Sequence, residues 1–188
     1  MRKKIQPIQT EDLILRPFQV SDAPAMFVNW AQDEEVVEFL TWSPHESIAE
    51  SLAICTEFEF DNRGFGANWA ITEKANPQMA IGSLGVVRRD EDIMACELGY
   101  CLARKFWGRG YMTQAVRAAI DFLFEEMGYN RVAARHDSNN PASGKVMVKA
   151  GMVKEGVLRQ AGKSNHGIGD MVCYSILRSE WLEGKKNQ

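Results

Sequence analysis

The sequence predicts a mixed α/β fold whose central sheet is mostly antiparallel and flanked by helices. Three strand-like segments follow one another between residues 68 and 102 with short turns between them. Consecutive strands joined by short turns pair antiparallel. A long amphipathic segment then leads to the next strand, and a helical crossover allows these two strands to lie parallel. The 188 residues, which show no long Pro/Gly-rich linker, are expected to form a single domain over 1–188.

Seven strands and four helices are expected from hydrophobic periodicity and turn residues. The strands are Thr10–Phe18, Asn68–Thr72, Ala80–Arg88, Ile93–Leu102, Arg131–Arg135, Met152–Leu158 and Met171–Leu177. The helices are Asp22–Ala31, one that starts at Ser43-Pro44, Arg109–Met127 and Asn140–Ala150. Asn76-Pro77 and residues 90–92 are expected to be turns.

Two serines are expected to cap helices in the first third of the chain. Ser21 precedes Asp22, and Ser43 precedes Pro44 with Glu46 completing a capping box. The helix after Ser43 then has an apolar stripe that is expected to face the core. The stripe consists of Ile48, Ala49, Leu52, Ala53 and Phe60.

Composition excludes several classes of function. The 22 basic and 25 acidic residues give a net charge of -3, whereas nucleic-acid-binding domains usually show a basic excess. No apolar run approaches the roughly 20 residues that span a bilayer, and no apolar signal core follows the basic N-terminus. A cytoplasmic protein that binds neither membrane nor nucleic acid directly is expected. The four cysteines and three histidines are scattered, so neither a disulfide nor a metal site is expected.

The junction after the fourth expected strand carries the strongest chemical signal. There Arg104-Lys105-Phe106-Trp107-Gly108-Arg109-Gly110 leads into the long helix. Gly108 and Gly110 suit a tight turn or close approach to a ligand. No Ser, Thr, Asp or Asn stands at the helix start, so the first amides are free to bind an anion at the positive end of the helix dipole. Arg104, Lys105 and Arg109 add positive charge, and Thr113 adds a hydroxyl one turn later.

Spacing alone leaves two interpretations of this junction open: an ordinary glycine-rich turn, or a phosphate site. A dinucleotide-binding fold does not fit, because Thr113 replaces the third glycine and the preceding strands do not alternate with helices. A P-loop does not fit, because no Gly-Lys-Ser/Thr sequence is present.

Several motifs together resemble the GCN5-related N-acetyltransferases (GNAT), and within them the RimJ/RimL-type enzymes that acetylate protein N-termini. The family's Gln/Arg-x-x-Gly-x-Gly/Ala motif is matched by residues 105–110, with Lys105 in place of Gln/Arg. The other similar segments are 10–17, Glu97-Leu98-Gly99-Tyr100, residues 107–115, Asn140-Pro141-Ala142-Ser143 and residues 149–152.

The resemblance implies a GNAT fold with strands four and five splayed apart and acetyl-coenzyme A (acetyl-CoA) in the gap. The pantetheine arm would pair with the main chain of Tyr100, Cys101 and Leu102. The pyrophosphate would lie on amides of Phe106, Trp107, Gly108, Arg109 and Gly110. Asn140 and Ser143 would lie beside the coenzyme. No metal takes part.

Direct transfer requires a base for the amine and a proton donor for the leaving thiolate. Glu97 is the predicted base, acting through water; the alternative is a solvated or salt-bridged strand carboxylate. Ser143 is the predicted acid; the alternative is a helix residue bonded to backbone. Many family members have a tyrosine four places after this serine, where this chain has Met147. An acyl-enzyme on Cys101 is not expected, because no histidine is near it in sequence to activate the thiol. For Asn140, helix capping is an equally good explanation.

The expected acceptor is a primary amine, most simply a protein N-terminus. An α-amine has a pKa near 8 against about 10.4 for lysine, so a modest base suffices. A small-molecule amine acceptor and a non-catalytic acyl-CoA-binding module remain alternatives. Trp30, Trp42, His45 and Phe65 are considered for the acceptor side, although core packing is the commoner role of aromatics. A monomer and a homodimer are both compatible with the sequence.

Overall fold

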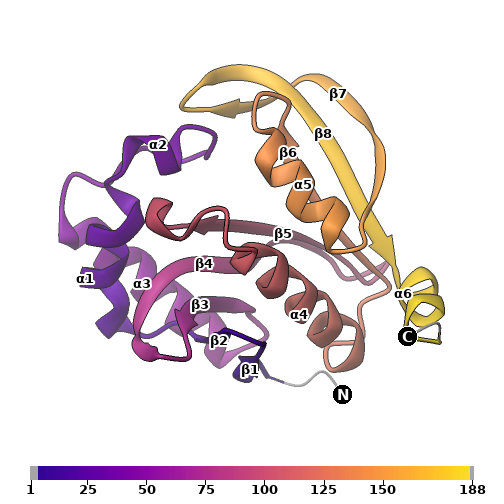
Figure 1. The fold of residues 1–188 in the computed structure, drawn as a ribbon, viewed down its shortest axis with the longest axis horizontal. Helices are drawn as coiled ribbons and strands as arrows, with labels where there is room; N and C mark the ends of the chain where they lie inside the picture. Colours follow the sequence, from indigo (N-terminus) through magenta and orange to yellow (C-terminus); the bar gives the residue numbers. More distant parts are fainter. Residues whose placement is uncertain (1–3, 187–188) are drawn as a thin grey trace.

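The computed structural model describes residues 4–186, and its centre is a twisted sheet with helices on both faces (Figure 1). The strands are β1 (Ile8–Gln9), β2 (Leu13–Pro17), β3 (Asn68–Glu73), β4 (Asn76–Asp90), β5 (Ala95–Leu102), β6 (Arg131–Asp137), β7 (Val153–Ser164) and β8 (Gly167–Leu177). Their order in the sheet is β1-β2-β3-β4-β5-β6-β8-β7. Within the described residues β5–β6 is the parallel pair and the other neighbours are antiparallel, which confirms the predicted mixed fold.

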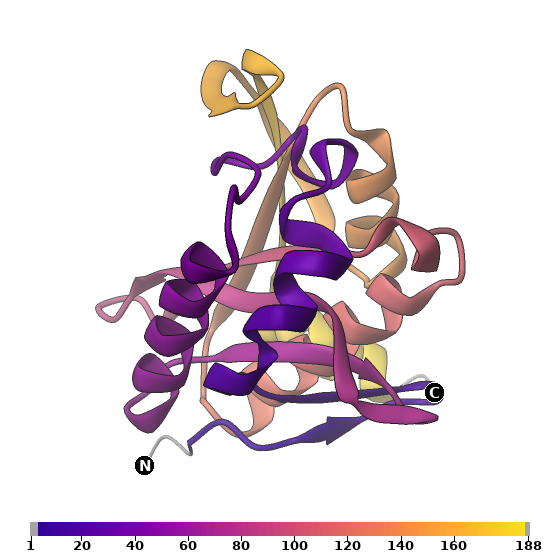
Figure 2. The same ribbon diagram turned by 90° about the vertical axis from the view of Figure 1, so that its left-hand side faces the viewer.

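The helices are α1 (Ala23–Met26), α2 (Glu34–Val37), α3 (Ile48–Arg63), α4 (Tyr111–Glu125), α5 (Pro141–Lys149) and α6 (Arg178–Lys186). Short 3-10 turns cover Val20–Asp22 and Arg104–Phe106, and a π-helical turn, Phe27–Ala31, follows α1. Helices α1 and α3 lie on one face of the sheet, and α4 and α5 lie on the other (Figures 1 and 2). The core between these layers includes Leu13, Leu15, Trp69, Ala119 and Leu123.

Several predicted boundaries were wrong. The expected strand Thr10–Phe18 is divided into β1 and β2, so the predicted strands four and five are β5 and β6 here. Asn76-Pro77 begins β4, and the turn before it is Lys74-Ala75. The predicted helix Arg109–Met127 is α4, which begins at Tyr111, and Gly108 and Gly110 precede it. Helices α2 and α6 were not predicted.

The capping predictions in the first third were also wrong. Helix α3 begins at Ile48 with Ser47, not Ser43, at the extended N-cap position. The preceding chain is held irregular by tertiary contacts, since His45 N donates to Ala31 O at 2.8 Å. Ser21 does not cap either; the Asp22 carboxylate accepts from Gln19 N at 2.9 Å.

The predicted apolar stripe of α3 faces solvent. Ile48, Leu52 and Phe60 are 47%, 44% and 72% exposed, and Ala49 and Ala53 are also exposed. The buried face instead carries Ser51 and Asn62. Their polar groups bond to residues just outside the helix: Ser51 Oγ lies 2.8 Å from His45 Nδ1, and Asn62 Nδ2 donates to Asn68 O at 2.8 Å.

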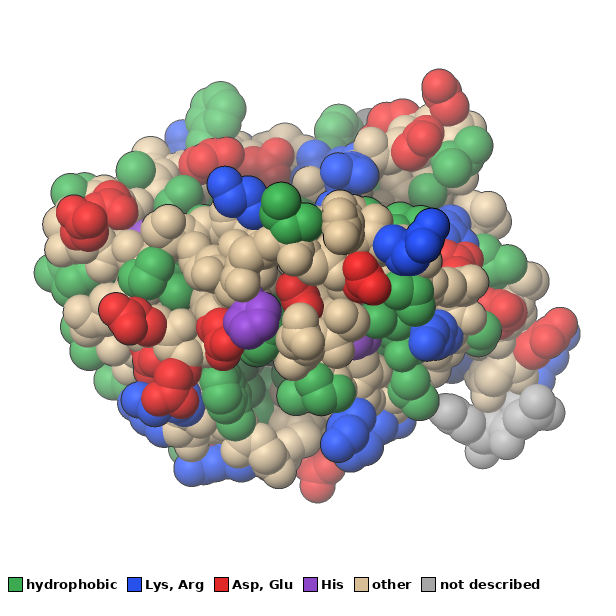
Figure 3. Space-filling view, turned by 90° about the horizontal axis from the view of Figure 1, so that it is seen from above, with side chains coloured by type: hydrophobic (Ala, Val, Ile, Leu, Met, Phe, Trp, Pro, Cys, Tyr) green, Lys and Arg blue, Asp and Glu red, His purple; other side chains and the backbone are tan. Residues whose placement is uncertain are grey.

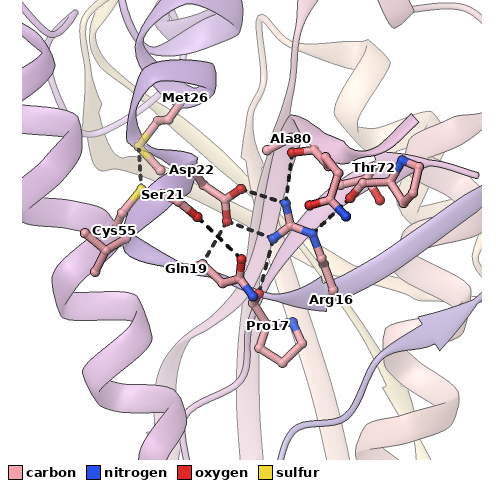
Figure 4. Close-up of polar contacts among 12 residues, drawn as sticks. Arg16, Pro17, Gln19, Ser21, Asp22, Met26, Cys55, Thr72 and Ala80 are labelled. Atoms are coloured by element: carbon pink, nitrogen blue, oxygen red, sulfur yellow. Dashed lines mark hydrogen bonds and ion pairs between the residues drawn. The ribbon is translucent and has the colours of Figure 1, made fainter.

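A buried ion pair ties β2 to the start of α1 (Figure 4). The Arg16 guanidinium donates to both carboxylate oxygens of Asp22, at 2.8 and 2.6 Å. Asp22 is 3% exposed. Removing one partner of such a pair leaves a buried charge unpaired, which costs about 3–5 kcal/mol.

The sheet opens between β5 and β6. Parallel pairing runs from Ala95↔Arg131 to Leu98↔Ala134 and stops there, while β5 continues to pair with β4 as far as Leu102. This confirms the predicted splay. The backbone of residues 99–102 therefore faces a gap on the β6 side, and the functional site forms around it.

The hairpin of β7 and β8 arches toward α2 (Figure 1). At its tip, Asn165 Nδ2 donates to Val37 O and Trp42 O, both at 2.8 Å. His166 Nδ1 lies 3.1 Å from a Glu38 carboxylate oxygen. The tip thus closes one end of the space between the sheet and the α1–α3 segment. Seen from above, acidic and basic side chains are interspersed over this part of the surface (Figure 3).

Candidate active site

The loop before α4 exposes backbone amides at a helix start. Gly108 and Gly110 have φ values of 76° and 79°, in the left-handed region that glycine adopts without strain. A Cβ at either position would meet no atom within 4 Å, so conformation rather than crowding explains these glycines. Gly110 is the N-cap of α4, and no side chain caps the helix. The amides of Tyr111, Met112 and Thr113 lack intrahelical partners by helix geometry and are available to an anion.

Two of the three expected cations lie at this loop. Lys105 Nζ and the Arg109 guanidinium lie 5.1 and 5.2 Å from the centre of the Phe106 ring. Arg104 instead points to the other side of the site. It forms ion pairs with Asp33, at 3.2 Å, and with Glu35. Arg104 therefore anchors the α2 region and is not available to a phosphate at the loop.

One cleft of about 1560 Å³ brings most of the predicted site residues together. Eleven of the thirteen line it, and Lys105 and Arg109 lie outside its lining. The eleven are Glu97, Tyr100, Cys101, Leu102, Phe106, Trp107, Gly108, Gly110, Thr113, Asn140 and Ser143. The cleft extends from the α4 loop through the β5–β6 gap to α2 and α3, so it joins both faces of the sheet.

The two faces of β5 carry different chemistry because successive strand residues point to opposite sides. Tyr100 points toward α5, where its hydroxyl lies 3.0 Å from Ser143 Oγ. Cys101 points to the opposite face and lies 3.2 Å from Ser83 Oγ on β4. Glu97, four residues earlier, shares the face of Cys101. A group that passes through the gap therefore meets Tyr100 and Ser143 on one side and Glu97 on the other.

Glu97 forms an ion pair with Arg135 of β6. A Glu97 carboxylate oxygen lies 2.9 Å from Arg135 Nε, and the Glu97 side chain is 19% exposed. The parallel register places Glu97 opposite Ala133 of β6. Arg135 is two residues after Ala133, so its side chain lies on the same face of the sheet as that of Glu97. Arg135 was not predicted as a site residue. Glu97 is therefore salt-bridged, as the alternative interpretation expected. A carboxylate accepts several hydrogen bonds, however, and the contact with Arg135 uses only part of that capacity.

Ser143 lies in the first turn of α5. Its N–H donates to the Asn140 side chain at 3.3 Å, so Asn140 caps α5 with Pro141 at the first helical position. The Ser143 backbone carbonyl also lies 3.2 Å from the Tyr100 hydroxyl. Burial raises the pKa of Tyr100 to about 12, so its hydroxyl stays protonated at neutral pH. Met147, where many family members have tyrosine, is buried.

Cys101 is not a nucleophile at neutral pH. Burial raises the pKa of its thiol to about 11, against an ordinary value near 8.5. Little of the thiolate that a covalent mechanism needs is therefore present at pH 7. The neighbouring Leu102 carbonyl already accepts a hydrogen bond from the Trp107 indole at 2.7 Å.

Acidic side chains line the other arm of the cleft, between α2 and α3. They are Glu35, Glu38, Glu57 and Asp61. Arg63 and Arg88 line the same arm, and Glu35 and Asp61 are already paired with Arg104 and Arg89, so the arm carries both signs of charge. Trp42 and Phe65 also line it. Trp30 is a core residue at 1% exposure, and His45 bonds Ser51, so these two aromatics do not line this space.

The described residues contain no group of three or more His, Cys, Asp or Glu side chains that could hold a metal ion. Between residues 4 and 186, no helix combines the length and apolar character needed to cross a bilayer.

Comparison with known proteins assigns the family. Residues 12–153 match the model of the acetyltransferase (GNAT) domain. The chain belongs to the GNAT acetyltransferase family. An uncharacterized N-acetyltransferase of Bacillus licheniformis is 27% identical over 178 residues, which cover 94% of this chain and 99% of the relative. A putative ribosomal N-acetyltransferase of Bacillus subtilis is 36% identical over 105 residues, 56% of this chain and 57% of the relative.

Among solved structures, the microcin C7 self-immunity acetyltransferase, determined with acetyl-CoA and AMP, has the same fold. Its TM-score is 0.81 at 19% identity, with 89% of this chain and 93% of that chain covered. Membership of the acetyltransferase (GNAT) family makes this chain an N-acetyltransferase that uses acetyl-CoA. The uncapped start of α4 and the open β5–β6 gap fit such a co-substrate, since the first suits a pyrophosphate and the second admits an extended arm.

Proposed function

We propose that this enzyme acetylates the N-terminal α-amine of a protein, as RimJ/RimL-type enzymes do. The observation that carries the proposal is the end of β5–β6 pairing at Leu98, directly beside Glu97. An acyl group that reaches through the gap from the Ser143 side arrives next to a carboxylate that faces the arm of the cleft between α2 and α3. The half-chain likeness to a putative ribosomal N-acetyltransferase supports the same acceptor class.

Glu97 is the proposed base, acting through a water molecule. Its carboxylate retains lone pairs beyond the contact with Arg135 and accepts a proton from the attacking amine through that water. The Arg135 guanidinium contributes a second effect. A fixed positive charge close to the acceptor disfavours the ammonium form and so favours the neutral amine, which is the nucleophile.

The weakness of this base favours an α-amine over a lysine side chain. An α-amine with a pKa near 8 loses its proton at pH 7 for about 1 to 1.5 kcal/mol, whereas lysine requires about 4 to 5 kcal/mol. On the opposite face, Ser143 donates a hydrogen bond to the leaving thiolate. The amides of residues 108–113 hold the pyrophosphate; those of Phe106 and Trp107, which were also predicted to do so, already donate to Ala103 O and Arg104 O, at 2.9 and 3.0 Å.

Turnover of acetyl-CoA with three classes of acceptor tests this function. The classes are peptides with a free α-amine, polyamines, and peptides with a blocked N-terminus and one lysine. We expect turnover with the first class at least tenfold above the others. A preference for polyamines would show that the acceptor is a small amine and not a protein N-terminus. Tight coenzyme binding without turnover of any acceptor would favour a non-catalytic module.

A further inference from the structure

The hydroxyl of Tyr100 and that of Ser143 form a pair across the coenzyme side of the β5–β6 gap. Tyr100 Oη lies 3.0 Å from Ser143 Oγ and 3.2 Å from the Ser143 carbonyl oxygen. The two residues are 43 positions apart and come from different elements, β5 and α5. Both line the cleft. The aromatic hydroxyl here comes from the strand, while Met147 stands at the helix position where a tyrosine is common in the family.

Two hydrogen-bond arrangements fit these distances. In one, Tyr100 donates to the Ser143 carbonyl oxygen and accepts from the Ser143 hydroxyl, which turns that hydrogen away from the gap. In the other, Tyr100 donates to Ser143 Oγ, and the Ser143 hydrogen is free to point into the gap. The two differ only in the rotation of two O–H bonds, and negative charge that develops in the gap favours the second.

Tyr100 is unsuited to be the source of the proton. Its pKa of about 12 lies more than three units above that of an ordinary thiol, near 8.5. Transfer from the phenol to a thiolate is therefore unfavourable by more than about a thousandfold. The phenol can act as a permanent donor of a hydrogen bond, since it stays protonated throughout the neutral range.

We propose that Tyr100 is a positioning residue for the leaving thiolate: its hydroxyl donates to Ser143 Oγ and so directs the Ser143 hydrogen to the sulfur. This inference rests on the proposed function, in which Ser143 faces the coenzyme sulfur. No proton leaves the phenol. The thiolate leaves as a hydrogen-bonded anion and takes its proton from solvent, while the proton lost by the amine leaves on the Glu97 side.

A double-mutant cycle separates this role from simple tethering of β5 to α5. We expect Tyr100→Phe to lower kcat about tenfold with little change in the KM for acetyl-CoA, which corresponds to loss of one hydrogen bond made in the transition state. In a Ser143→Ala background, Tyr100→Phe should have no further effect on kcat. A tether through the Ser143 carbonyl would survive in that background, so an equal loss in both backgrounds would overturn the proposal. Tyr174→Phe, which removes a hydroxyl from a buried tyrosine of β8, is the matched control.

An equilibrium measurement tests the same role without turnover. The pKa of the coenzyme A thiol bound to the protein is followed by the ultraviolet absorbance of the thiolate, with desulfo-coenzyme A as the blank. Donation toward sulfur stabilises the thiolate, so Tyr100→Phe should raise the pKa of the bound thiol by about one unit. An unchanged pKa would refute the role of Tyr100. Absence of wild-type turnover, with this shift present, would count against the proposed function and not against Tyr100.

Discussion

Gly110 offers the sharpest test of the coenzyme loop, because two nearly isosteric side chains can be compared there. Gly110 has a φ of 79°, and a Cβ would meet no atom within 4 Å. Asn and Asp both tolerate the left-handed region better than other non-glycine residues, so Gly110→Asn and Gly110→Asp share the same backbone strain of about 1 kcal/mol. They differ in one negative charge at the start of α4.

That charge would lie beside the proposed pyrophosphate. Two unit charges about 6 Å apart at an effective dielectric constant of about 20 repel by about 3 kcal/mol at low salt. Screening at physiological salt lowers this repulsion to about 1.5 kcal/mol. The Kd for coenzyme A should therefore be roughly 10- to 100-fold higher for Gly110→Asp than for Gly110→Asn. Titration calorimetry at two salt concentrations measures both the difference and its screening.

Loss of folding would not explain this result. A negative side chain near a helix N-terminus stabilises the helix by about 0.3–1 kcal/mol, so the Asp variant should be at least as stable as the Asn variant. Equal Kd values for the two folded variants would refute the placement of the pyrophosphate on this loop.

Three further outcomes follow from the geometry. Glu97→Gln should lower kcat about 100-fold and leave the affinity for acetyl-CoA intact, as stopped-flow and binding assays would show. An unchanged kcat would mean that Glu97 has only a structural role, in its salt bridge with Arg135. Asp22→Ala should lower the free energy of unfolding, measured in urea, by about 3–5 kcal/mol, because the buried Arg16 charge loses its partner. Arg63→Ala is the control: it breaks the exposed pair with Glu59 and should change the free energy of unfolding by less than about 1 kcal/mol. Burial lowers the pKa of His45, so the unfolded chain binds its proton more readily and stability should fall as pH drops below about 6.5. His45→Gln should reduce that slope between pH 7.5 and pH 5, and an unaltered slope would contradict the assignment.

Local signals predicted the glycine-rich turn before α4 and the strands around it. The glycines at 108 and 110 and the missing cap are properties of adjacent residues. The structure shows the expected tight turn, with both glycines in the left-handed region, and the expected uncapped helix start. The splay was expected from the family resemblance and lies where the β5–β6 register stops.

Features set by contacts between different elements were not predictable in this way. The α3 stripe faces solvent because Ser51 and Asn62 on the opposite face bond to His45 and Asn68, partners outside the helix that periodicity cannot reveal. Arg135 meets Glu97 only through the parallel register of two strands separated by α4. The Tyr100–Ser143 contact likewise depends on how α5 packs against the end of β5. One signal was available for Arg135: it is an ionisable residue in a strand expected to flank the gap.

The position of the acetyl group on a single peptide tests the central claim most directly. A peptide with a free N-terminus and an internal lysine is incubated with the enzyme and acetyl-CoA, and tandem mass spectrometry locates the product. Acetylation at the α-amine, with the lysine unmodified, is the predicted result. Acetylation at the lysine, or of neither amine under conditions in which a polyamine is acetylated, would contradict it.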